Sequence, residues 1–288
     1  MKTQTALLVS TLLLGLSSVP ALAQTPLWSL EGFDQPESVL NDKARQVLYI
    51  SSINGAPLEL NGKGYISRVS ESGDMLDKQW VTGMDAPKGM AIGGDKLYVA
   101  DMSMLRIVDI ATGKLLESVT ANGSKLLNDV TVADDGVVYI TDMLAGGIYR
   151  YADGQLTRWF EHDDIPHPNG IHFHNGELLI VSWGKGIKDD FTTDELGSLF
   201  RLNPKTRTLT LDENVRHIGN LDGVGISGDL TITNDWLNGN VFAVDANGSK
   251  KLFNAGKSAA DISVAKGKLY VPVMFEGRVD VYQMDTFQ

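Results

Sequence analysis

Short apolar runs recur along the chain from about residue 35 to the end. They are four to seven residues long, rich in Val, Ile, Leu and Tyr, and bounded by Gly, Asp and Asn. That pattern is typical of β-strands joined by tight turns. Four runs make a unit of about forty residues, and the first run of each unit reads SVLND from Ser38, GMAIG from Gly89, VTVAD from Val130, GIHFH from Gly170, GVGIS from Gly223 and DISVA from Asp261.

Six units of four strands predict an all-β fold, a six-bladed β-propeller. A blade cannot bury both of its faces alone, whereas stacking blades around an axis buries them. No long segment of the mature chain has apolar residues at helical spacing, so we expect almost no helix there.

The last unit has only three runs before the chain ends at Gln288. The segment PLWSLEG at 26–32 precedes the first unit and carries Trp28 and Leu30. We therefore expect this N-terminal strand to complete the sixth blade and close the ring.

Two units carry longer segments between their second and third runs, INGAPLELNGKG at 53–64 and WGKGIKDDFTTDEL at 183–196. Their equivalent places in the repeat put both on one face of the propeller. Loops of this length are often functional. We expect them to rim a pocket.

The first 23 residues have the features of a cleaved signal peptide. Lys2 is followed by an apolar stretch at 6–19 and by the cleavage signal Ala21-Leu22-Ala23. We predict a mature protein that begins at Gln24, consists of a single propeller domain over 24–288, is periplasmic or secreted, and is not inserted in the membrane.

Composition narrows the partners. The chain has no cysteine, so its stability rests on its core, for which 43% apolar residues suffice. A net charge of −11 argues against nucleic acid or an anionic membrane as a partner. No Gly-rich phosphate loop, serine nucleophile elbow or HExxH motif is present in the sequence.

A polar residue precedes the first run in five of the six units. In a propeller the first strands are innermost, so these positions converge on the axis at one end of the channel. In chain order the six positions are Glu37, Lys88, Asn128, Asn169, Asp222 and Ala260. Carboxylate and amide oxygens suit a hard divalent cation. The alternative is a polar channel without metal, in which Lys88 neutralises the two carboxylates.

Several other residues are candidates for supporting roles. Lys88 could stabilise an oxyanion or bind a substrate carboxylate, or it could form a structural ion pair. His167, two residues before Asn169, is a candidate substrate-binding proton shuttle, and Trp183 a candidate pocket residue. Asp129 and Asp261 fall one place after the axial position or its equivalent. They could support the ligands from behind, or bond to the backbone of a neighbouring blade.

Four fragments in register, QPESVL, LLNDVTV, HPNGIHF and NLDGVGI, resemble the gluconolactonase/regucalcin family and, more distantly, paraoxonase-type lactonases. The resemblance spans residues 26–288. It implies that Glu37, Asn169 and Asp222 bind a divalent metal with the assistance of Asn128. It also implies that the metal polarises a lactone carbonyl, while Asp222 serves as general base or metal-activated water attacks.

The chain departs from sugar-lactone members of that family at three positions. Leu126 stands where those members have an Arg, Val130 stands where they have a Gly, and Lys88 is an additional cation. These departures suit a less polar lactone or ester, or a site that binds without turnover.

Our leading hypothesis is a metal-dependent hydrolase that opens a small-molecule lactone or ester. We expect one divalent cation, Ca²⁺ in the first place, with Mg²⁺, Mn²⁺ or Zn²⁺ as alternatives. Two other hypotheses stay open. One is a non-catalytic propeller that binds a small ligand or a protein, and the other is a metal-free, strictosidine-synthase-like site that uses Lys88.

Overall fold

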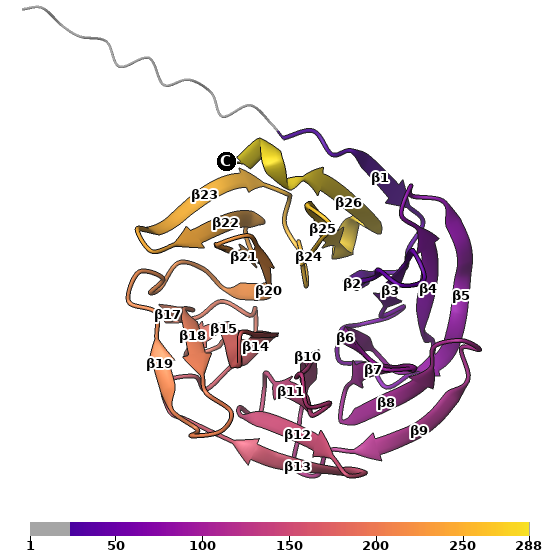
Figure 1. Cartoon of the computed structure of the whole chain (residues 1–288), viewed down its shortest axis with the longest axis horizontal. Helices are drawn as coiled ribbons and strands as arrows, with labels where there is room; N and C mark the ends of the chain where they lie inside the picture. Colours follow the sequence, from indigo (N-terminus) through magenta and orange to yellow (C-terminus); the bar gives the residue numbers. More distant parts are fainter. Residues whose placement is uncertain (1–23, 288) are drawn as a thin grey trace, which may run out of the picture.

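Six four-stranded antiparallel sheets surround a central axis in the computed structural model, which describes residues 24–287 (Figure 1). The prediction of an all-β, six-bladed propeller is confirmed. Within the described residues the helical elements are two short 3₁₀ turns, η1 (Met274–Glu276) and η2 (Met284–Phe287). No helix of this part is long and apolar enough to cross a membrane. The predicted signal peptide at 1–23 lies outside the described residues, and export stays a prediction.

The strands of each blade follow one another from the axis outward (Figure 1). Blades 1 to 3 consist of β2 (Pro36–Asp42), β3 (Val47–Ser52), β4 (Gly64–Ser70) and β5 (Met75–Met84); β6 (Pro87–Gly93), β7 (Lys96–Asp101), β8 (Met104–Asp109) and β9 (Leu115–Thr120); and β10 (Leu127–Val132), β11 (Val138–Asp142), β12 (Ile148–Ala152) and β13 (Gln155–Phe160). Blades 4 to 6 consist of β14 (Pro168–His174), β15 (Glu177–Ser182), β18 (Leu199–Leu202) and β19 (Leu209–Leu211); β20 (Leu221–Ser227), β21 (Leu230–Asp235), β22 (Asn240–Asp245) and β23 (Gly248–Asn254); and β24 (Ser263–Ala265), β25 (Lys268–Val273), β26 (Arg278–Gln283) and β1 (Trp28–Glu31).

The core lies between the blades. Successive side chains of a strand point to opposite faces of its sheet. On β3, Leu48 and Ile50 pack toward blade 6, whereas Tyr49 packs toward blade 2. Every neighbouring pair of blades shares such an apolar cluster. The inner strands are therefore apolar on both faces, which explains the nearly continuous apolar runs of the sequence.

The ring is closed by β1, as the sequence predicted. It pairs antiparallel with β26, which places Trp28 opposite Val281 and Leu30 opposite Val279. The indole of Trp28 also donates to the Glu71 carbonyl at 3.3 Å. The sixth sheet is thus made from both ends of the described chain, so that β26 has no free edge.

The innermost strand of blades 1 to 5 contains a bulge at the same place. Two consecutive residues of this strand face one residue of the second strand, at 37–38, 88–89, 128–129, 169–170 and 222–223. A bulge bends its strand and redirects the side chains it contains. The recurring polar residue of the sequence is the first residue of this bulge in every case.

The second bulge residue faces the neighbouring blade. It is glycine at positions 89, 170 and 223. A Cβ atom on Gly170 would collide with the carbonyl oxygen of Asp222, and one on Gly223 with the backbone nitrogen of Ile262. Glycine therefore permits the close approach of adjacent inner strands.

The two long segments lie at the same mouth of the channel and contribute side chains to one cavity, as predicted. The segment after β15 forms a small hairpin of β16 (Gly184–Lys185) and β17 (Glu195–Leu196), a feature that the sequence did not predict. Phe191 at its tip has φ of 64°. This left-handed conformation is strained for an aromatic residue. The Trp183 indole supports it by donating to the Phe191 carbonyl at 2.8 Å.

Candidate functional site

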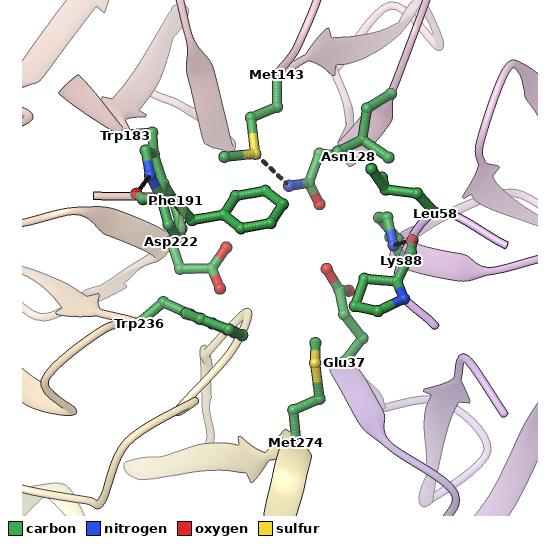
Figure 2. A pocket seen from close by; sticks show the side chains of 12 residues that line it. Glu37, Leu58, Lys88, Asn128, Met143, Trp183, Phe191, Asp222, Trp236 and Met274 are labelled. Atoms are coloured by element: carbon green, nitrogen blue, oxygen red, sulfur yellow. Dashed lines mark hydrogen bonds between the residues drawn. The ribbon is translucent and has the colours of Figure 1, made fainter. Parts of the chain in front are cut away.

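The five polar side chains at the bulges meet at one end of the channel. We call them the polar ring: Glu37, Lys88, Asn128, Asn169 and Asp222. Each is buried, with an exposed fraction of 6% or less. Figure 2 shows all of them except Asn169 around a cavity of about 490 Å³ including its mouth. The sixth axial position is taken by the buried, apolar Ala260.

Asn169 lies beside the cavity and connects two members of the ring. Its Oδ1 accepts a hydrogen bond from Asn128 Nδ2. Its Nδ2 donates to Asp222 Oδ1 at 2.7 Å and to the Leu221 carbonyl at 3.1 Å. The structure therefore brings the predicted residues together. It places Asn169 beside the cavity, where it orients the side chains of Asn128 and Asp222 instead of lining the site as the metal ligand that the resemblance implied.

The charges of the polar ring are not balanced. Burial raises the pKa of Glu37 and of Asp222 well above their ordinary values. The negative charge of Asp222 raises the pKa of Glu37 further, and that of Asp261 raises the pKa of Asp222. The Lys88 ammonium opposes both shifts, while burial lowers its own pKa. Lys88 Nζ donates to the Pro57 carbonyl at 3.2 Å. Glu37 Oε2 is buried and has no hydrogen-bond partner.

Asp129 and Asp261 lie next to the polar ring in the sequence or in its equivalent position, and their carboxylates bond to groups of their own or a neighbouring blade. Asp129 accepts backbone N–H groups from Val130 and from Ile171 of the next blade, each at 2.7 Å. Asp261 accepts the Ser38 hydroxyl at 2.5 Å. Asp129 thus bonds to the backbone of a neighbouring blade, as in the alternative given for both acids, whereas Asp261 bonds to a serine side chain of blade 1. Both acids still add negative charge near Glu37, whose pKa they raise.

Asp261 predicts a pH dependence of stability. Burial raises its pKa from 3.8 to about 7. Between about pH 4 and pH 7 the folded state therefore keeps a proton that the unfolded chain has lost, so the free energy of unfolding falls as pH rises. We expect Asp261→Asn to flatten this decline by up to about 4 kcal/mol, at about 1.4 kcal/mol per pH unit.

Urea unfolding in EDTA across this pH range measures the effect. Asp245→Asn, at an exposed position of β22, is the matched control and should keep the wild-type profile. An equally steep decline in Asp261→Asn and the wild type would contradict the assignment.

Carboxylates at the ends of three second strands hold the backbone that carries the polar ring. Asp101 Oδ1 accepts the N–H of Ala86 at 2.8 Å, two residues before Lys88. Asp142 Oδ1 accepts the N–H of Leu126 at 3.0 Å, and Asp235 Oδ2 that of Asn220 at 3.2 Å. The sequence did not predict that these carboxylates hold the backbone next to the polar ring.

An apolar ring lies next to the polar ring, and four of its members, Met143, Trp183, Trp236 and Met274, line the cavity. It consists of the residue that directly follows the second strand of each blade: Ile53, Met102, Met143, Trp183, Trp236 and Met274. Sequence reasoning recognised Trp183 as a pocket residue but missed most of the set. The sequence contained a signal for this ring, because an apolar residue directly follows each second run. Met follows YVAD, YITD and YVPV, and Trp follows LIVS.

The structure places the two remaining candidates differently. Trp183 is buried in the cavity wall, 5.8 Å from Trp236 between ring centroids. His167 lies behind the wall, where its Nδ1 is 2.8 Å from the Met143 carbonyl oxygen. It does not line the cavity.

The fold is shared with several solved structures. A putative gluconolactonase superposes with a TM-score of 0.63 at 18% identity, over 92% of this chain and 96% of that one. A catalytically inactive virginiamycin B lyase from Staphylococcus aureus, solved with quinupristin, gives 0.60 at 14% identity over 88% and 98%. A chain of a nidogen/laminin complex gives 0.61 at 12% identity over 80% and 93%.

No protein-family model matches the sequence, and no curated protein matches it either. The class that the fold defines is a six-bladed β-propeller with a buried polar site at one mouth of its channel. Its structural neighbours include a putative gluconolactonase and a lyase. At such identities the similarity shows the fold alone.

Proposed function

We propose that the protein is a metal-dependent hydrolase that opens a lactone or related ester. The observation that carries this proposal is Glu37, whose buried carboxylate has an oxygen without a hydrogen-bond partner and faces Asp222 across the cavity (Figure 2). A buried carboxylate is costly unless a cation or a donor compensates it. A divalent ion between Glu37 and Asp222 would supply that compensation.

The donor set fits a hard cation. Glu37, Asp222 and Asn128 line the cavity with carboxylate and amide groups, which Ca²⁺ and related ions prefer. Asn169 would keep the side chains of Asn128 and Asp222 oriented. Three or more His, Cys, Asp or Glu side chains do not gather as a metal site within residues 24–287, so the set depends on Asn128 as a neutral ligand.

The residues of the ring can each serve in ring opening. A bound divalent ion would polarise the lactone carbonyl as a Lewis acid. Asp222, positioned by Asn169, would accept the proton of the attacking water and return it to the ring oxygen as the acyl C–O bond breaks. Lys88 lines the same cavity, where its ammonium protons other than the one bonded to Pro57 would stabilise the developing oxyanion.

Thermal unfolding in EDTA, followed by the addition of single divalent ions, tests the metal site. An ion that binds only the folded state stabilises it by roughly 2.7 kcal/mol at a hundredfold excess over its dissociation constant. We expect one ion, Ca²⁺ first, to raise the midpoint in the wild type but not in Asp222→Asn. A panel of lactones with that ion would follow. If no ion shifts the midpoint, the metal proposal fails.

A second candidate is favoured by the position of Lys88. Its ammonium is buried beside Glu37 and Asp222, and it partly compensates their charge without metal. In that case the site would bind its ligand, or act on it, through Lys88. Lys88→Met would then abolish ligand binding, whereas under the first proposal it would leave the metal-dependent shift of the midpoint in place.

A further inference from the structure

The cavity has two chemically different parts. Its floor is the polar ring, and its wall is apolar from Leu126 up to the mouth. Figure 2 shows Met143 and Met274 on two opposite sides, with Leu58 and Trp236 on the other two. Phe191 reaches in from the tip of the β16–β17 hairpin. A ligand whose reacting group lies on the floor would therefore extend its remainder along hydrocarbon, aromatic and thioether groups.

The polar atoms that border this wall are already engaged. The Trp183 indole N–H donates to the Phe191 carbonyl. The Pro57 carbonyl accepts from Lys88, and Asn128 Nδ2 is directed at Asn169 and at the sulfur of Met143, 3.6 Å away. Hydroxyl groups of a ligand would lose water here without gaining comparable partners, which is unfavourable.

The shape of the wall also suits an apolar group of variable form. Thioethers are polarizable and flexible, so Met143 and Met274 can adapt to different hydrocarbon shapes. Trp183, Trp236 and Phe275 form a chain of ring contacts with centroid separations of 5.8 and 5.3 Å. Leu58 is 43% exposed on a loop at the mouth, where a ligand would cover it.

We propose that this site selects a lactone or ester with an apolar alkyl or aromatic substituent over a polyhydroxylated one, and that Leu58, Phe191 and Trp236 determine this specificity. The identity of the reacting group rests on the function proposed above. The preference for an apolar substituent rests on the cavity wall and can be tested by itself.

The experiment uses γ-lactones with alkyl side chains of increasing length and a polyhydroxylated γ-lactone, with the activating ion present. We expect kcat/KM to rise about three- to fourfold for each methylene until the cavity is filled. The polyhydroxylated lactone should be opened at least tenfold more slowly than the best alkyl lactone. In parallel, quenching of tryptophan fluorescence by the corresponding alkyl γ-lactams measures binding without turnover.

Leu58→Ser should reduce the gain per methylene in both measurements. Leu116→Ser removes a similarly exposed leucine, 49% exposed on β9 far from the cavity, and should leave the gain unchanged. A similar loss in both variants would overturn the assignment of Leu58.

The outcomes separate this inference from the proposed function. Faster opening of the polyhydroxylated lactone, or rates independent of chain length, would overturn the apolar specificity while the lactonase proposal stands. If no lactone is opened but lactam affinity still rises with chain length, the lactonase proposal fails and the apolar specificity stands. An affinity for the lactams that does not depend on the length of the alkyl chain would overturn the apolar specificity.

Discussion

We expect Glu37→Gln to lower kcat/KM for the proposed lactone opening on the order of 10³-fold, equivalent to about 4 kcal/mol of transition-state stabilisation. Glutamine keeps the volume of the side chain but removes the charge that would hold a cation opposite Asp222. The same change should eliminate the ion-dependent rise of the unfolding midpoint. In EDTA the variant should be at least as stable as the wild type, because a neutral amide costs less to bury without a partner than a carboxylate does.

Rates on the lactone panel and thermal unfolding with and without the activating ion check this prediction. Glu31→Gln, at an exposed position of β1, is the matched control and should behave like the wild type. Full activity in Glu37→Gln together with a large loss in Lys88→Met would instead place the chemistry at Lys88.

We expect removal of residues 24–31 to unfold the propeller or to leave it only marginally stable. The truncation deletes β1, exposes the edge of β26, and uncovers Val279 and Val281. Native domains are stable by only about 5–15 kcal/mol. The single change Trp28→Ala should cost about 2–3 kcal/mol, less than for a fully buried tryptophan, because Trp28 is half-buried.

Urea unfolding midpoints measure both changes. Leu27→Ala serves as control, since this side chain is 52% exposed and should contribute little. A synthetic peptide of residues 24–32 should restore stability to the truncated chain by adding a strand to β26. An unchanged midpoint after truncation would mean that the ring does not depend on this closure.

The propeller could be predicted from the sequence because each strand and turn is indicated by residues that are close together in the chain. Gly, Asp and Asn mark the turns, and the apolar runs mark strands that are buried on both faces. The closure of the ring could be predicted by counting the runs in each unit. The sixth unit lacks one run, and the segment at 26–32 has the composition to supply it. Both predictions are confirmed.

The details of the site depend on contacts between distant residues, which a pattern does not contain. A bulge at 37–38 is defined by what faces it on β3, so the sequence could indicate that Glu37 is axial but not how its side chain is aimed. In the same way, the hydrogen bonds that connect Asn169 to Asn128 and Asp222 join residues of three different blades, which a local sequence pattern does not contain. The metal, the substrate and the catalytic roles stay proposals.

The hydrogen bonds from backbone N–H groups to Asp101, Asp142 and Asp235 bear on how the sequence of such a protein can vary. They fix the polar ring from within the blades, whereas Leu58 and Phe191 belong to segments inserted between strands. The polar ring and two of the side chains proposed to recognise the ligand are thus held by separate parts of the fold. Exchange of 53–64 or 184–196 for other sequences offers a way to alter the proposed selectivity, by evolution or in the laboratory, while the backbone of the polar ring stays in place.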